Sequence, residues 1–100
     1  MIIYSKTKIY IGKIFEILKN YYESFRKFEE ALQIDQQIND LMGIASDLYN
    51  IGRIWTIRGE YRKALQNFKD SLKILNQLNQ EQYIEVIQKK INELREKINI

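Results

Sequence analysis

The residue types that most often do chemistry in proteins are scarce in this chain. It contains no histidine and no cysteine, which removes the most common general base, nucleophile and zinc ligands. Carboxylates such as Glu29, Glu30, Asp35 and Asp47 are scattered without a spacing that would force two of them together, and no glycine-rich phosphate loop is present. The sequence therefore indicates a protein without catalytic activity, cofactor or metal site.

The polar residue types that remain suit binding. An asparagine side chain donates and accepts hydrogen bonds at once, which complements a peptide unit. Lysine and arginine hold carboxylates through charge-assisted hydrogen bonds. Which of these residues share a surface depends on the elements that carry them.

Composition predicts a single folded domain made of helices. The 100 residues allow one domain with a core of modest size, and 45% of them are hydrophobic against 29% charged. There is no proline and there are only four glycines, while helix-forming residues are abundant. These features favour an all-α protein.

Charge and targeting signals exclude several classes of protein. Without cysteine there can be no disulfide, and no apolar run approaches the roughly 18 residues of a membrane span. The opening MIIYSKTKIYIGK has lysines inside its apolar pattern and does not resemble a signal peptide, so we expect a cytoplasmic protein. The net charge of +3 is too small to imply nucleic acid by itself.

One segment of the sequence is repeated. The stretch 59-GEYRKALQNFKDSL-72 follows 19-KNYYESFRKFEEAL-32 at a distance of 40 residues. Aligned at that distance, the matching pairs are mostly large and apolar: Ile11 with Ile51, Gly12 with Gly52, Ile14 with Ile54, Phe15 with Trp55, Tyr21 with Tyr61, Phe28 with Phe68, and Leu32 with Leu72. Matches at helical spacing select a buried face, which predicts a repeated helical unit.

Each copy reads as two helices. The first copy predicts a helix from about Ile3 to Leu18, a break at Lys19-Asn20, and a second helix to about Ile38. In the second copy Asp40 is the expected N-cap, and Gly59 is expected to end the first helix. We thus predict repeat 1 over about 3–40, repeat 2 over about 41–80, and a capping helix over about 82–98. That last helix has a single apolar stripe: Ile84, Ile87, Ile91, Leu94 and Ile98.

The mid-helix glycines predict close packing within each pair. A glycine there costs about 1 kcal/mol relative to alanine, so it usually has a packing reason. Gly52 would let the second helix approach the first, with Trp55 and Phe68 filling the adjacent space. In the first copy the same arrangement would use Gly12 with Phe15, Ser24 and Phe28.

These residues resemble the tetratricopeptide repeat, whose pattern is W-x2-L-G-x2-Y…A-x3-F…P. In the second copy the residues at the positions of this pattern are Leu48, Ile51, Gly52, Trp55, Ala64, Phe68 and Ser71. In the first copy they are Ile11, Gly12, Phe15, Ser24, Phe28 and Ala31. The 40-residue spacing is similar to an extended variant found in kinesin light chains and many prokaryotic repeat proteins. Lys8 departs from the pattern at an apolar slot, and Asn92 departs at the glycine slot of the last helix.

The resemblance implies a superhelix of two helical pairs and a cap, whose concave groove binds a peptide. The residues expected to contact it are Lys6, Tyr10, Lys13, Tyr49, Asn50, Arg53 and Lys90, with Val86, Lys89 and Glu93 continuing the surface. The basic members suggest an acidic peptide or a C-terminal carboxylate, although they could equally be ordinary solvated charges. Ile9 stands where chaperone-binding relatives have lysine, so chaperone binding is not predicted.

The main function predicted is therefore that of a protein–protein interaction adaptor. One alternative is weak nucleic-acid binding, which would need the basic and aromatic residues to form one continuous stripe. The other is self-assembly as a homodimer through the N-terminal helix, because two repeats are few for a stable solenoid. That helix is apolar on more than one face: Ile2, Ile3, Ile9, Ile11, Ile14, Phe15, Ile17 and Leu18.

Overall fold

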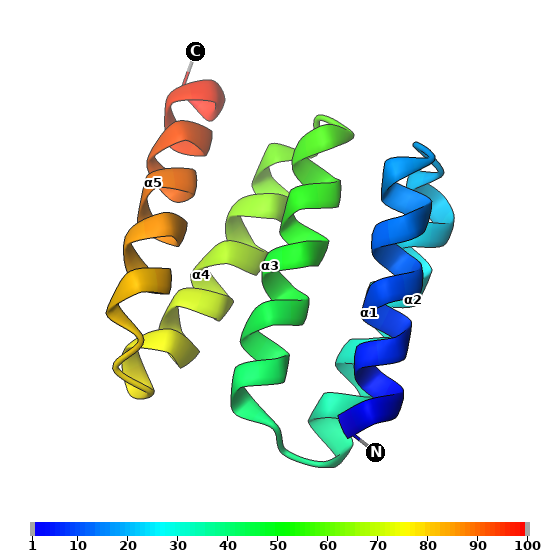
Figure 1. The fold of residues 1–100 in the computed structure, drawn as a ribbon. Helices are drawn as coiled ribbons and strands as arrows, with labels where there is room; N and C mark the ends of the chain where they lie inside the picture. The colour runs from blue at the N-terminus through cyan, green and yellow to red at the C-terminus, as the bar shows by residue number, and fades with distance from the viewer. Residues whose placement is uncertain (1, 100) are drawn as a thin grey trace.

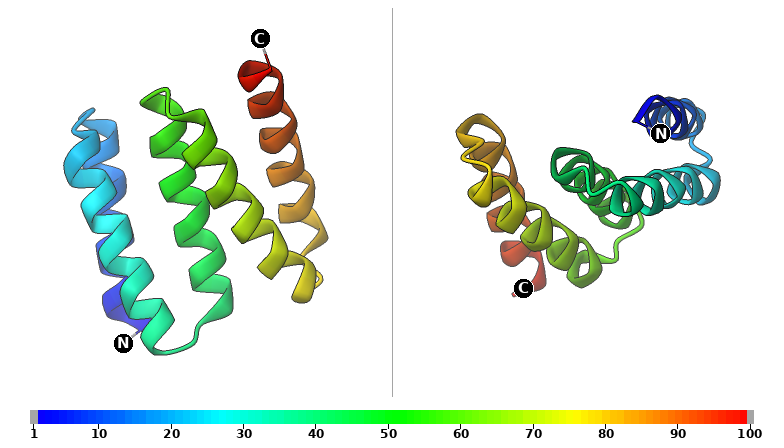
Figure 2. Two further views of the ribbon diagram at one scale, coloured as in Figure 1. Left: turned by 180° about the vertical axis from the view of Figure 1, so that it is seen from behind. Right: turned by 90° about the horizontal axis from the view of Figure 1, so that it is seen from below.

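The computed structural model describes residues 2–99, and in that range it contains five α-helices and no strand. The helices are α1 (Ile2–Ile17), α2 (Tyr21–Gln37), α3 (Leu41–Ile57), α4 (Tyr61–Gln77) and α5 (Glu81–Ile98). Helices α1, α3 and α5 form one layer with α2 and α4 behind it (Figure 1). The stack bends so that this first layer lines the concave side (Figure 2). The predicted all-α superhelix of two hairpins and a capping helix is confirmed.

The turns between helices share one construction and recur every twenty residues. The second residue after each of the first four helices lies in the left-handed region, with φ values of 61° at Lys19, 56° at Asn39, 79° at Gly59 and 55° at Asn79. The following residue then donates its N–H to a carbonyl five residues earlier, as from Asn20 to Phe15 at 2.8 Å. These bonds close the helix ends and reverse the chain, so sequential helices run antiparallel. The predicted break at Lys19-Asn20 and the predicted end at Gly59 are confirmed.

Each hairpin closes around a contact between a glycine and a phenylalanine. A Cβ atom on Gly12 would lie 2.8 Å from Cε1 of Phe28, and one on Gly52 would lie 2.7 Å from Cε1 of Phe68. Because real Cβ atoms do not approach other atoms so closely, only glycine lets these buried rings reach the first helix. The matching surroundings of Gly12 and Gly52 confirm that the two hairpins are copies of one unit.

A serine also ties each hairpin together, but from opposite sides. In the second hairpin Ser71 of α4 donates to the carbonyl of Ala45 in α3 at 2.7 Å. In the first hairpin Ser5 of α1 donates to the carbonyl of Ala31 in α2 at 3.4 Å. The two copies thus exchange serine and alanine between equivalent positions and keep one buried contact.

Lys8, which departs from the repeat pattern, is accommodated by a partner on α2. Its ammonium lies 3.1 Å from a carboxylate oxygen of Glu30 and 5.1 Å from the centre of the Tyr4 ring. Hydrogen bonding to Glu30 raises the pKa of Lys8, and Lys8 lowers the pKa of Glu30. A cation can therefore stand where the second hairpin has Leu48.

The hairpins dock through α2 on α3, and the cap docks through α5 on α4. In the first of these joints Phe28 packs with Ile51 and Ile54, and the Phe25 ring meets Trp55 edge-on at 4.9 Å. The second joint buries Phe68, the equivalent of Phe28, in one cluster with the aliphatic residues Leu75, Ile87, Ile91 and Leu94. The predicted apolar stripe of the capping helix is confirmed, since its three central residues are buried. Among the described helices none is long and apolar enough to cross a membrane.

Candidate functional site

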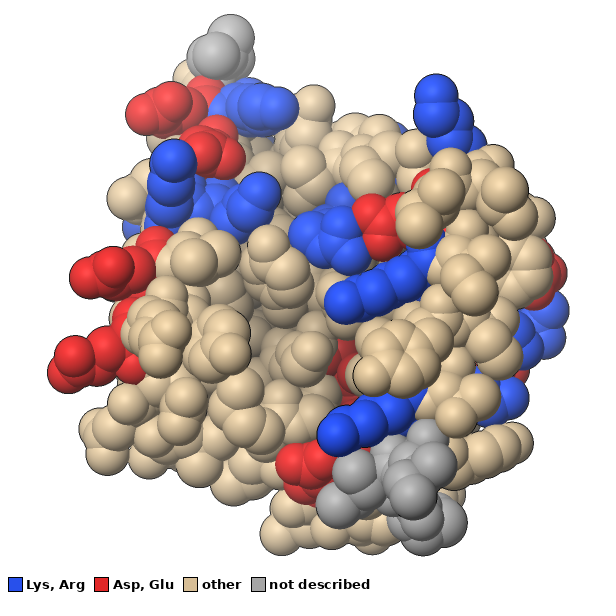
Figure 3. Space-filling model, viewed as in Figure 1, with Lys and Arg blue, Asp and Glu red and all other residues tan. Residues whose placement is uncertain are grey.

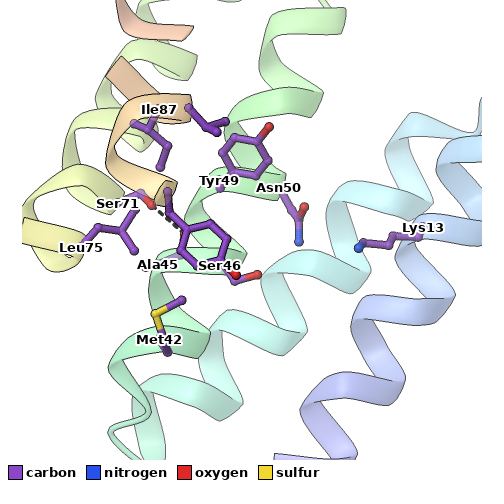
Figure 4. Close-up of a pocket in the computed structure, with 11 residues that line it drawn as sticks. Lys13, Met42, Ala45, Ser46, Tyr49, Asn50, Ser71, Leu75 and Ile87 are labelled. Carbon is purple, nitrogen blue, oxygen red and sulfur yellow. Dashed lines mark hydrogen bonds between the residues drawn. The ribbon is translucent and has the colours of Figure 1, made fainter. Parts of the chain in front are cut away.

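The concave face carries a pocket of about 400 Å³. Four helices line it: α1 with Lys13, α3 with Met42, Ala45, Ser46, Tyr49 and Asn50, α4 with Ser71 and Leu75, and α5 with Tyr83, Val86 and Ile87 (Figure 4). Most of these side chains are apolar, and Met42, Tyr83 and Val86 are well exposed to solvent. Exposed apolar residues gathered around a hollow favour the binding of an apolar group.

Asn50 and Lys13 bring hydrogen-bond donors to this pocket. Asn50 is only 5% exposed, and its carbonyl oxygen accepts a hydrogen bond from Arg53 at 3.3 Å. Its amide nitrogen donates to none of the described residues. Figure 4 shows Lys13 reaching from α1 toward the amide end of Asn50. Two neighbouring donors suit a ligand that offers a carbonyl or a carboxylate.

Arg53 is engaged within the protein. Its guanidinium forms two hydrogen bonds to the Glu16 carboxylate, of 2.5 and 2.8 Å, and lies 5.8 Å from the centre of the Tyr49 ring. A two-point pair of this kind fixes both side chains and links α1 to α3. Glu16 therefore neutralises the positive charge that the sequence suggested for a partner.

The other residues expected in the groove lie away from this pocket. Tyr10 is exposed on α1, Lys90 is half-buried on α5, and neither lines it. Lys6 lines a smaller pocket of about 220 Å³ together with Asp35 and Asp40. Figure 3 shows Lys and Arg groups across the upper middle of this face, with Asp and Glu groups beside them, next to an uncharged hollow.

Sequence reasoning overlooked part of the pocket. Val86 was expected on this surface, but Tyr83 and Met42 were not. Tyr83 lies three residues before Val86 and so shares its helical face, which is the signal that could have identified it. Ile87 belongs to the apolar stripe predicted for the capping helix, and the structure shows that it also lines the pocket, as Leu75 does.

A second overlooked feature is a pair of buried carboxyl groups between α2 and α3. Asp47 is 0% exposed and Asp35 is 2% exposed. Burial raises the pKa of Asp47 to about 9, and the neighbouring carboxyl groups of Asp35 and Asp40 add to the shift. The expectation that acidic residues are scattered without pairing is wrong, because antiparallel packing of α2 and α3 brings these two together. In residues 2–99 no group of acidic residues is placed to hold a metal ion.

Comparison with known proteins identifies the repeat. No curated protein matches the sequence significantly. A family model described as "Tetratricopeptide repeat" matches residues 5–77, from the first turn of α1 to the end of α4. This range includes both glycine–phenylalanine contacts and both serine contacts, which are the features that define each hairpin. The chain belongs to the tetratricopeptide repeat family.

Proposed function

We propose that this protein is a non-catalytic adaptor that holds a peptide segment of a partner protein in the concave pocket. Tetratricopeptide repeats are generally protein-interaction modules. The observation that carries the proposal is the open apolar pocket between α3 and α5, with donors along one edge. Contact between its exposed apolar residues and water is unfavourable, and a bound partner would remove that contact.

The lining specifies the chemistry of the peptide. A bulky apolar side chain would fit between Tyr49 of α3 and Val86 of α5, where Leu75 of α4 also lines the pocket. The amide of Asn50 and the ammonium of Lys13 suit a main-chain carbonyl or an acidic group beside that apolar residue. Since Arg53 is held by Glu16, acidity contributes to binding mainly through Lys13.

A displayed library of random peptides, selected on the native protein, would test this proposal. Selected peptides should share an apolar residue next to an acidic one. Calorimetry should then show that Val86→Glu raises Kd by about tenfold or more, because it places a charge in the apolar pocket. Lys13→Glu should raise Kd less and mainly for acidic peptides.

The matched control is Lys69→Glu, which makes a similar change of charge on an exposed residue of α4 outside the pocket. Its Kd values should equal those of the native protein. Peptides that bind Val86→Glu and Lys69→Glu with equal affinity would show that the concave pocket is not the binding site.

A second candidate function is self-association through α1. It is favoured by comparing the exposure of equivalent residues in α1, α3 and α5. Ile14 of α1 is 56% exposed, whereas its equivalents Ile54 of α3 and Leu94 of α5 are 0% and 2% exposed. Ile17 and Leu18 extend the same exposed apolar surface. Of the other residues that suggested it, Ile9, Ile11 and Phe15 are half-buried, and the side chains of Ile2 and Ile3 lie outside the described residues.

The polar character of α5 indicates which surface of a second copy would cover α1. Apart from Tyr83 and Val86 at the pocket, α5 exposes polar side chains such as Lys89, Asn92 and Glu93, so it offers a second copy less apolar area than α1 does. We therefore propose that two α1 helices pack on each other as a symmetric dimer.

Light scattering at high micromolar concentration would test the dimer. The native protein and the control Ile57→Glu, altered at an exposed apolar residue of α3, should show the mass of two chains. Ile14→Glu should show the mass of one chain. The native protein at the mass of one chain, or Ile14→Glu at the mass of two, would contradict the proposal.

A further inference from the structure

The α2–α3 joint contains a carboxyl group that has no hydrogen-bond partner. Asp47 lies in the middle of α3, is 0% exposed, and neither of its oxygens accepts a hydrogen bond from any described residue. An ionised carboxylate in such a place is strongly unfavourable, because it has lost water and gained no donor. Its ionised state is therefore the one that the fold disfavours.

Two further carboxyl groups, of Asp35 and Asp40, are near enough to influence Asp47. A Cβ atom on Gly43 would lie 2.7 Å from an oxygen of Asp35 and 2.7 Å from an oxygen of Asp40. Only a glycine leaves room for both at this point. Asp40 also caps α3 by accepting the N–H of Gly43 at 3.2 Å. Lys6 of α1 borders the same pocket as Asp35 and Asp40, but no lysine or arginine in residues 2–99 forms an ion pair with Asp47.

One proton resolves the conflict between Asp35 and Asp47. A protonated Asp47 becomes a donor, and the carboxylate of Asp35 becomes its acceptor, so each group gains a partner. The remaining negative charge is better placed on Asp35, which lies against the first turn of α3, where the helix dipole favours an anion.

We propose that Asp47 and Asp35 form an acid–carboxylate pair that holds one proton between the two hairpins, and that loss of this proton loosens the α2–α3 joint. The raised pKa of Asp47 agrees with this geometry. At the equivalent positions of the α4–α5 joint the chain has Leu75 and Ile87, which cannot titrate. Sensitivity to pH is thus built into one joint and absent from the other.

The direction of the pH effect follows from the raised pKa. The folded protein keeps on Asp47 a proton that the unfolded chain releases near pH 4, so stability falls as pH rises from about 4 to about 9 and then levels off. The unfolding constant should rise by up to about tenfold per pH unit in that window. The chain has no histidine and no cysteine, whose side chains most often titrate between pH 5.5 and 9.

Urea unfolding between pH 5.5 and 9 should compare the native protein with Asp47→Asn. The asparagine amide can donate to Asp35 as the protonated acid does, but it cannot titrate. All other titratable groups are common to both proteins and cancel in the comparison. The unfolding constant of the native protein should rise steadily with pH, and that of Asp47→Asn should stay nearly flat.

Carbon-13 NMR of the native protein provides a readout that needs no variant. The Asp47 carboxyl signal should titrate several units above pH 4, and amide signals of α2 and α3 should shift with the same midpoint while those of α5 do not. An Asp47 midpoint near 4, or equal pH slopes for the native protein and Asp47→Asn, would overturn the proposal. So would an Asp47 titration that leaves the α2 and α3 signals unmoved.

Discussion

The two hairpins share a backbone, yet they dock onto their next neighbour by different chemistry. Both close around a glycine–phenylalanine contact, and both end in the same left-handed turn. Phe28 and Phe68 pack in the first and the second joint respectively, but the first joint also buries Asp35 and Asp47, whereas the second has Leu75 and Ile87 at the equivalent positions. The repeat therefore requires these positions to be buried but does not require them to be apolar.

This difference has an energetic consequence for the order of stability along the chain. A fully buried leucine or isoleucine side chain stabilises the folded state by about 1.5–3 kcal/mol. The α2–α3 joint lacks this contribution at two positions and contains a proton-dependent pair in its place. We therefore expect the first hairpin to be docked less firmly than the capping helix, and increasingly so at alkaline pH.

The largest effect is expected from placing one aspartate in the α4–α5 joint. Ile87→Asp would bury a carboxyl beside Leu75 with no second acid to share a proton. Leaving a charge buried without a partner costs about 3–5 kcal/mol, so α5 should detach or the domain unfold at pH 8. Urea unfolding measures the loss, which should shrink at pH 5 as the carboxyl becomes protonated. A loss below about 1 kcal/mol at pH 8 would contradict this view of the joint.

The converse replacement should make the two joints alike. Asp35→Leu with Asp47→Ile copies the residues of the α4–α5 joint into the first one. Replacing a buried polar pair by apolar residues of similar volume commonly stabilises by about 1–4 kcal/mol. The gain in unfolding free energy should be larger at pH 8 than at pH 5. The native protein is less stable at pH 8, because keeping the proton on Asp47 becomes less favourable as pH rises. Asp47→Ile alone is the control and should gain less, since Asp35 then lacks its partner.

Substitution of the two hairpin glycines tests the part of the comparison in which the copies agree. Gly12→Ala and Gly52→Ala would each press a Cβ atom against a buried phenylalanine ring at 2.7–2.8 Å. Overpacking of this kind costs about 1–3 kcal/mol, partly offset by about 1 kcal/mol of helix propensity. The two losses, measured by urea unfolding, should agree within about 0.5 kcal/mol. A large difference would show that the hairpins are less equivalent than their geometry indicates.

The helices and their packing could be predicted from the sequence because the repeat provides the evidence twice. Apolar residues that recur after 40 positions identify the buried face, and Gly12 and Gly52 identify the close approach. The same alignment also contained a signal for the acid pair. It places Asp35 opposite Leu75 and Asp47 opposite Ile87, so two acids occupy positions that are apolar in the other copy.

The groove was harder to predict because it depends on contacts between helices far apart in sequence. Arg53 and Glu16 are 37 residues apart, and neither helical period nor charge count indicates that they pair. The pocket itself lies between residues of α3, α4 and α5, so the curvature of the stack decides which of Tyr10, Lys13 and Lys90 reach it. Side chains on the expected helical face therefore divide into those that line the pocket and those that do not.

The smallest effect is expected at the turns, where the copies differ by one residue. Lys19 adopts a φ of 61° and its equivalent Gly59 adopts 79°, and a lysine is strained in this left-handed region where glycine is not. Lys19→Gly should stabilise by about 0.5 kcal/mol, because relief of that strain exceeds the greater chain entropy of glycine in the unfolded state. Thermal unfolding should show a rise in Tm of about 2–4 °C for a domain of this size. Gly59→Lys should lower Tm by a similar amount, and the double exchange should leave it unchanged, since strain would only move from one turn to its copy. A Tm that falls in Lys19→Gly would mean that Lys19 contributes more through its side chain than its backbone loses.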